Sequence, residues 1–233
     1  QTCALPISQA DSKADATFVV NDFDKTLGFT YVDWQDKVTA ANGHLVLKGV
    51  KCSGGGGVNL KLDLSSYANR SPALKLKAKP ANTGKGLYVI FSDSKGHSGR
   101  WIFQVPVPAD EFAIVTAKGS AALSNPNVKE DKDNPDKPGD VDLANITQFH
   151  VGGDWSKETL DVEIDALLLV EPDAKMLAER ETYVKVQAEE AAVLAKKAAE
   201  EKAKLEKERE QLVKSIGYSC PDSPEVVLVS MVA

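Results

Sequence analysis

The stretch VNLKLDL at residues 58–64 decides the fold class, because apolar and polar side chains alternate along it without interruption. The stretch LKLKAK at residues 74–79 repeats this alternation. Successive side chains of a β-strand point to opposite faces, so each stretch predicts a strand with one buried and one solvated face. Similar short runs recur on both sides, with Gly, Asn and Pro between them, at residues 18–23, 29–34, 44–50, 87–91, 101–105, 111–117, 146–151 and 160–170.

About ten such strands, with no convincing helix between them, predict an all-β jelly-roll sandwich. We place this β domain at residues 17–171. The run GGGG at residues 54–57 is interpreted as turn chemistry, because glycine accepts the positive φ of tight turns. It is not interpreted as a phosphate-binding loop, since no Lys-Ser/Thr pair and no helix follow it. The acidic stretch at residues 128–142 fails the EF-hand spacing and is interpreted as a long solvated loop.

The pattern changes at Pro172, after which an Ala-rich, charge-laced stretch predicts one long α-helix over residues 172–217. Asp173 is a candidate N-cap and Gly217 a candidate C′ residue. Apolar residues repeat every seven positions from Leu177 to Leu212, but the companion heptad positions are mostly polar, which disfavours a strong coiled coil. We interpret the helix as a semi-rigid spacer, with half of an antiparallel helical hairpin or a dimerising coiled coil as alternatives, and expect a monomer.

Both ends of the sequence depart from those of an ordinary complete domain. Residues 1–8 resemble a translated sequencing adapter, so we interpret residues 1–16 as an artefactual or disordered leader; a remnant of a signal-peptide cleavage region is the alternative. Residues 218–233 contain a new strand-like run and are interpreted as the start of a further, missing domain. Cys52 and Cys220 lie in different modules, so no disulfide framework is indicated.

Composition and motifs exclude several classes of function. The net charge is −6, and no basic cluster with interleaved aromatic residues is present, so we expect no nucleic-acid binding. No run approaches the roughly 20 apolar residues of a membrane span. There is no Gly-x-Ser-x-Gly motif, and His44, His97 and His150 lie far apart in the sequence without metal-ligand spacing. We therefore predict that this chain is not an enzyme.

A series of short motifs, taken in order, is more specific than any one of them. They are NDFD at residues 21–24, GHLVLKG at 43–49, GGVNLKLDLSSY at 56–67, ALKLKAK at 73–79, LYVIFSDSKG at 87–96, RWIFQVPV at 100–107 and LDVEIDALLLVEP at 160–172. The series resembles the galactose-binding-like jelly rolls, which include many carbohydrate-binding modules attached to glycoside hydrolases. The resemblance implies the sandwich fold and a polysaccharide or oligosaccharide ligand.

Large rings are scarce, at 6% of the chain, so their positions suggest where a sugar could stack. Trp34 and Trp155 lie beside polar loop residues, and a loop Trp often has a ligand or partner. The alternative for both is that they cover the open ends of the sandwich, and for a strand Trp that it belongs to the core. The candidate ligand-binding residues are Trp34, Tyr88, Trp101, Gln104, His150 and Trp155, with Gln104 and His150 as hydroxyl partners.

The resembled modules often hold a structural calcium between their first and last strands. Carried over to this sequence, that site matches Asp24 and Asp165, with Asp22 as a further candidate. Calcium prefers several oxygen ligands, which carboxylates supply. The alternative is that these side chains are exposed edge carboxylates. A structural calcium is the one cofactor that we predict.

These observations predict a noncatalytic polysaccharide-binding module within a larger modular protein that acts on polysaccharides. The resemblance further implies a secreted, periplasmic or cell-surface location. The alternative, from another functional class, is a structural or protein-interaction β-sandwich with the helix as an assembly element. Exposed aromatic rings on one face would favour the first hypothesis, and a face filled by Lys and Thr the second.

Overall fold

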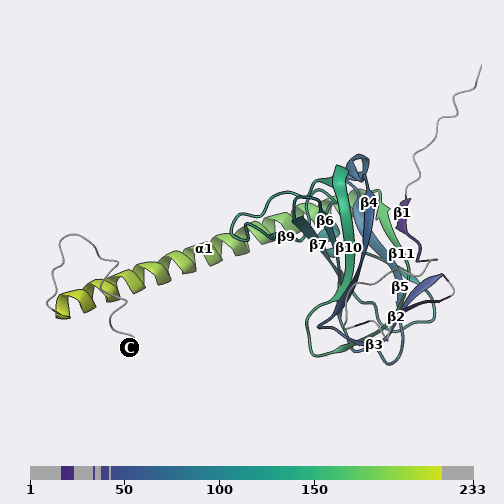
Figure 1. Ribbon diagram of the computed structural model, residues 1–233, viewed down its shortest axis with the longest axis horizontal. Helices are drawn as coiled ribbons and strands as arrows, with labels where there is room; N and C mark the ends of the chain where they lie inside the picture. Colours follow the sequence, from purple (N-terminus) through teal and green to yellow (C-terminus); the bar gives the residue numbers. More distant parts are fainter. Residues whose placement is uncertain (1–16, 24–33, 35–37, 42, 217–233) are drawn as a thin grey trace, which may run out of the picture. The chain divides into compact units, whose positions relative to one another are not determined.

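The chain folds into two antiparallel β-sheets followed by one long helix, as seen in a computed structural model that describes residues 17–23, 34, 38–41 and 43–216 (Figure 1). The predicted jelly-roll sandwich with a C-terminal helix is confirmed. The predictions for residues 1–16, for Asp24 and for residues 218–233 lie outside the described residues.

Sheet A has the strand order β2-β3-β11-β5-β8, and β1 pairs with the same edge of β11 as β3 does. The long strand β11 thus joins the first strand of the domain to the middle of the sheet. Its strands are β1 (Thr17–Asn21), β2 (Val38–Ala41), β3 (His44–Lys51), β5 (Ser71–Ala78), β8 (Ala113–Thr116) and β11 (Thr159–Val170).

Sheet B has the order β4-β10-β6-β7-β9, and all its described pairings are antiparallel. Its strands are β4 (Gly55–Leu62), β6 (Gly86–Asp93), β7 (His97–Gln104), β9 (Val128–Asp131) and β10 (Ile146–Gly153). The short strand β9 corrects one interpretation, because residues 128–131 of the acidic stretch pair with β7 instead of forming a solvated loop.

The core lies between the two sheets and follows the alternation read from the sequence. In β4, Val58, Leu60 and Leu62 pack against the core, whereas Asn59 and Lys61 are exposed. Sheet B contributes aromatic rings, with Phe91 at 5.4 Å from Trp101 and 6.4 Å from Phe149 between ring centroids. Burying such rings supplies much of the hydrophobic stabilisation of a small sandwich.

The glycine run at residues 54–57 is mostly strand. Residues 55–57 pair with β10, which corrects the interpretation of the whole run as turn chemistry. Glycine in the interior of a strand has an entropic cost and often marks a place where another group approaches the backbone closely. The glycines of β4 therefore leave room for side chains of the neighbouring strand β10.

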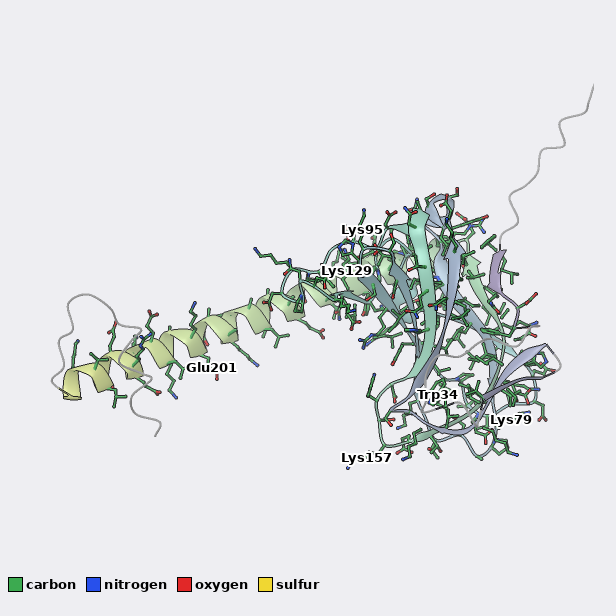
Figure 2. The ribbon with its side chains drawn as sticks, viewed as in Figure 1. Trp34, Lys79, Lys95, Lys129, Lys157 and Glu201 are labelled. Atoms are coloured by element: carbon green, nitrogen blue, oxygen red, sulfur yellow. The ribbon has the colours of Figure 1, made fainter. Side chains whose placement is uncertain are left out.

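Helix α1 (Ala174–Ile216) starts where the sequence predicts. The Asp173 carboxylate accepts a hydrogen bond from the backbone N–H of Met176 at 2.8 Å, so Asp173 caps the helix. Side chains project on all sides of the helix, Glu201 among them (Figure 2), and residues 184–214 are almost entirely exposed. No helix among the described residues is long and apolar enough to span a bilayer.

The first two turns of α1 belong to the same compact unit as the sandwich, which extends to Thr182. The Arg180 guanidinium donates to the Ser120 carbonyl at 2.8 Å and to the Ser71 hydroxyl at 2.9 Å. The Ser120 hydroxyl in turn donates to the Glu179 carboxylate at 2.9 Å. Hydrogen bonds to charged groups are among the stronger ones in proteins, so these contacts fix the start of the helix.

Candidate functional site

The outer face of sheet B, which points away from the core, carries side chains from β4, β10, β6, β7 and β9 in cross-strand rows. We call these rows the ring face. The antiparallel registers align three rows, which are Gly55, Gly152, Tyr88 and Ile102; Gly57, His150, Ile90, Arg100 and Val128; and Asn59, Gln148, Ser92, Ser98 and Glu130.

Two of these glycines make room for aromatic rings. A Cβ added at Gly152 would lie 2.3 Å from the ring of Tyr88, and a Cβ added at Gly57 would lie 1.6 Å from the imidazole of His150. Real Cβ atoms essentially never approach other atoms so closely. Each ring therefore lies directly against the backbone of the neighbouring strand, where no other residue type would leave space for it.

The contact with the backbone restrains both rings, while their side chains stay only half-buried. Burial lowers the pKa of the His150 imidazole, which favours the uncharged ring near neutral pH. Tyr88 and His150 thus present two fixed, uncharged aromatic groups on an open surface.

Polar groups surround the two rings. The guanidinium carbon of Arg100 lies 5.1 Å from the centroid of the Tyr88 ring, and Arg100 also forms an ion pair with Glu130 of β9. The Gln148 amide donates to the Asn59 side-chain oxygen at 3.1 Å. The ring face therefore combines aromatic surface with hydrogen-bond donors and acceptors, which suits a ligand that is partly apolar and rich in hydroxyls.

Three of the predicted ligand residues lie on the outer side of sheet B. Tyr88 and His150 form the two rings, and Gln104 is exposed at the end of β7, opposite Gly86 of β6. Because side chains alternate along a strand, Gln104 shares the outer side of sheet B with Ile102. The structure thus brings together residues that lie far apart in the sequence.

Trp34 and Trp101 are corrections to the predicted site. Both are 0% exposed and belong to the buried hydrophobic core. The Trp34 indole N–H donates to the Lys51 carbonyl, and that of Trp101 to the Ala122 carbonyl, each at 3.0 Å. A Trp whose ring is enclosed and whose N–H is satisfied internally offers no surface to a ligand, so both belong to the core.

Trp155 lies in the loop between β10 and β11 and is 64% exposed. It adopts φ 61°, a region that non-glycine residues rarely occupy, and its backbone N–H donates to the Cys52 carbonyl at 2.9 Å. The loop follows the end of β10 that carries Gly152, next to the Tyr88 end of the ring face. Its role as a ligand contact stays a prediction.

The predicted calcium site stays a prediction, because Asp24 lies outside the described residues. Asp165 lies in β11, where its carboxylate contacts the Lys75 ammonium at 2.5 Å and the His44 imidazole at 3.0 Å. A calcium ion would have to compete with these two basic groups for the oxygens of Asp165. Asp22 is exposed, and no group of three or more His, Cys, Asp or Glu in the described part of the chain could hold a metal ion.

Sequence reasoning missed Gly57, Gly152, Arg100 and Glu130. The two glycines carry a usable signal, since glycine inside a predicted strand indicates close approach of another group. That signal does not say which ring approaches, because the partner comes from a strand distant in the sequence. Arg100 and Glu130 carry no such signal, as their contact depends on the pairing of β7 with β9.

No protein-family model matches the chain, and no curated protein matches it. Among solved structures, it is similar to an agarase, AgWH50C, with a TM-score of 0.49 and 15% identity over 67% of this chain and 25% of that chain. It is also similar to the family 11 carbohydrate-binding module of the cellulase Lic26A-Cel5E of Clostridium thermocellum, with a TM-score of 0.40 and 15% identity over 67% and 95% of the two chains.

A third similar structure is a point mutant of the family 29 module CBM29-2 complexed with cellulohexaose, with a TM-score of 0.35 and 12% identity over 66% and 89% of the chains. The matched region therefore spans about a quarter of the agarase and most of each module. These similar structures include the class of protein that the sequence motifs resemble.

Proposed function

We propose that the β domain binds a polysaccharide on the ring face. The observation that carries this proposal is the seating of Tyr88 and His150 against Gly152 and Gly57, which holds two rings in place on an otherwise open sheet. A ring that is already fixed loses little conformational freedom when a ligand stacks on it, so more of the contact energy contributes to affinity.

Sugars match this surface chemically. A pyranose ring has faces made of C–H groups, which can pack against Tyr88, and hydroxyls, which can bond to amides such as that of Gln148. An open face suits a chain that lies across several strands. Each contact is small, so we expect weak binding per site.

Affinity electrophoresis with soluble β-glucan, mannan and xylan tests the proposal. We expect at least one polymer to retard the protein, and Tyr88→Ala to reduce its affinity at least tenfold. Tyr183→Ala removes the same side chain from helix α1, which is not part of the ring face, and should leave retardation unchanged. Melting temperatures within a few degrees of the unsubstituted protein would show that both variants remain folded.

The alternative is a structural or protein-interaction sandwich. The observation that favours this alternative is the outer face of sheet A, where lysines of β5 form ion pairs with acidic residues of β11. If no polymer in the panel retards the protein, the carbohydrate proposal fails and the alternative gains. A polymer whose binding is insensitive to Tyr88→Ala would place the site elsewhere.

We further propose that the domain is noncatalytic and that helix α1 serves as a spacer in a larger, secreted protein that acts on polysaccharides. The charge-balanced, exposed surface of residues 184–214 supports a helix that does not pair with itself. Sedimentation of the peptide covering residues 172–217 should give the mass of a monomer. A tight dimer at micromolar concentration would contradict the spacer role.

A further inference from the structure

The ion pair of Arg100 and Glu130 lies at the edge of the ring face and gives it a chemical preference. Arg100 comes from β7, with its guanidinium carbon 5.1 Å from the Tyr88 ring centroid, and Glu130 comes from the edge strand β9. A ligand stacked on Tyr88 would therefore meet this pair. The two side chains are the only charged residues in the three cross-strand rows of the ring face, apart from the titratable His150.

Arg100 has a hydrogen-bond donor to spare. One terminal nitrogen of its guanidinium contacts Glu130, whereas its Nε–H is shielded from water and has no hydrogen-bond partner among the described residues. Because Nε has almost no accessible surface, a ligand oxygen beside Tyr88 would instead meet the terminal N–H groups of the guanidinium. The Arg100 side chain is 27% exposed, which leaves part of it open to a ligand.

The charge of Glu130 determines which kind of ligand oxygen can lie beside Arg100. Its carboxylate neutralises the guanidinium and is itself 41% exposed, so a ligand group beside Arg100 also meets negative charge. A hydroxyl suits both partners, because its oxygen can accept from a terminal N–H of the guanidinium and its hydrogen can be donated to the carboxylate. A uronate carboxylate or a sulfate would be repelled by Glu130 and would find the charge of Arg100 already compensated.

We propose that the Arg100–Glu130 pair makes the ring face selective for neutral polysaccharides over those bearing carboxylates. This inference rests on the proposed function and names the substrate class of the same site. Arg100 supplies a donor for a sugar hydroxyl, and Glu130 excludes anionic sugars.

The test compares soluble β-1,4-glucan and β-1,4-mannan with the same polymers oxidised at C6 to uronates. The unsubstituted protein should bind a neutral polymer at least tenfold more tightly than its oxidised form. Glu130→Gln exposes the charge of Arg100 and should raise affinity for the oxidised polymer at least fivefold, with a loss of that gain in high salt because screening weakens exposed charges. Affinity for the neutral polymer should not rise, because the amide that replaces the Glu130 carboxylate is a weaker acceptor for the sugar hydroxyl.

Two control variants separate the local effect from the net charge of −6. Glu111→Gln removes the same charge from an exposed position outside the ring face and should leave the preference unchanged. Arg100→Lys keeps the positive charge but removes the planar guanidinium and its terminal N–H donors, so it should weaken binding of the neutral polymer several-fold without improving the oxidised one.

The outcomes are distinguishable. Equal binding of neutral and oxidised polymers by the unsubstituted protein, or an equal response of Glu130→Gln and Glu111→Gln, would overturn the selectivity inference and leave the carbohydrate proposal standing. A complete lack of retardation by every polymer would overturn both. Melting temperatures of all variants establish that each change in affinity belongs to a folded protein.

Discussion

The outer faces of the two sheets use their side chains in opposite ways. On sheet A, Lys75 contacts Asp165 at 2.5 Å, while Lys77 and Lys79 contact the Glu163 carboxylate at 2.9 and 2.7 Å. These groups satisfy one another. On sheet B, the rings of Tyr88 and His150 lie over glycines, and each has one side against the backbone.

This difference indicates which face is built for a partner. Binding to a face covered by ion pairs disturbs those pairs, whereas rings that are already fixed can accept a ligand with little rearrangement. Sheet A's outer face is therefore a solvated, self-contained surface. The ring face offers two half-buried aromatic rings beside the Arg100–Glu130 ion pair.

The largest effect should come from the inner side of sheet B. Trp101→Ala removes a fully buried ring and its hydrogen bond to Ala122, and we expect a loss of about 3–5 kcal/mol in unfolding free energy. Chemical denaturation measures it. Tyr88→Ala, on the outer side of the same sheet, should cost much less. Equal losses from the two variants would show that the outer rings serve stability and not binding.

Gly57→Ala tests the seating of a ring on glycine. The new methyl would occupy the position of the His150 imidazole, so the ring must turn away, and overpacking of this kind typically costs about 1–3 kcal/mol. We expect at least a tenfold loss of affinity for the polysaccharide that retards the unsubstituted protein, measured by affinity electrophoresis.

A double-mutant cycle supplies the control for Gly57→Ala. In a His150→Ala background the added methyl has space, so Gly57→Ala should then have little further effect on affinity or stability. If the two substitutions instead add fully, the glycine matters for the strand itself and not for the ring.

Much of the fold could be predicted from sequence, because alternation is a local signal. The runs at residues 58–64 and 74–79 place their apolar residues inward, as expected. Alternation also puts Trp101 and Phe103 on one face, but it does not say whether that face is core or surface. That distinction depends on where the opposing sheet lies, which is a long-range property.

The site was predictable in part for the same reason. Tyr88 lies on the minority face of its strand, and the sequence indicates as much. The glycines beneath the rings lie in the strands that pair with those of Tyr88 and His150. The alternation within a strand does not predict which strands pair with each other. Asp165 is a similar case, since its contacts with Lys75 and His44 depend on the pairing of β11 with β5 and β3, which the motif around Asp165 does not specify.

The ring face should also respond to mild acid. Burial lowers the pKa of His150, so the unfolded chain binds a proton more readily than the folded domain. The stabilisation is present above the ordinary histidine pKa of about 6.5 and is lost as the pH falls below it, by about 1.4 kcal/mol for each pKa unit of depression. Urea denaturation at pH 7.5, 6.5 and 5.5 measures the slope. In His150→Gln, the part of the pH dependence of the unfolding free energy that comes from His150 should disappear. An unchanged pH dependence would show that it comes from other groups.

The smallest effect should come from the ion pairs of sheet A. Glu163→Gln leaves Lys77 and Lys79 without their shared carboxylate, yet partly exposed ion pairs contribute only about 0–1 kcal/mol each. The hydrogen bond from Lys79 lowers the pKa of Glu163, so this stabilisation is present above the ordinary glutamate pKa and is lost on acidification below it. Denaturation at low and high salt should show a small loss that salt erases, with polysaccharide retardation unchanged. A loss of retardation in Glu163→Gln would show that both faces take part in binding, and the contrast between the two sheets would then be wrong.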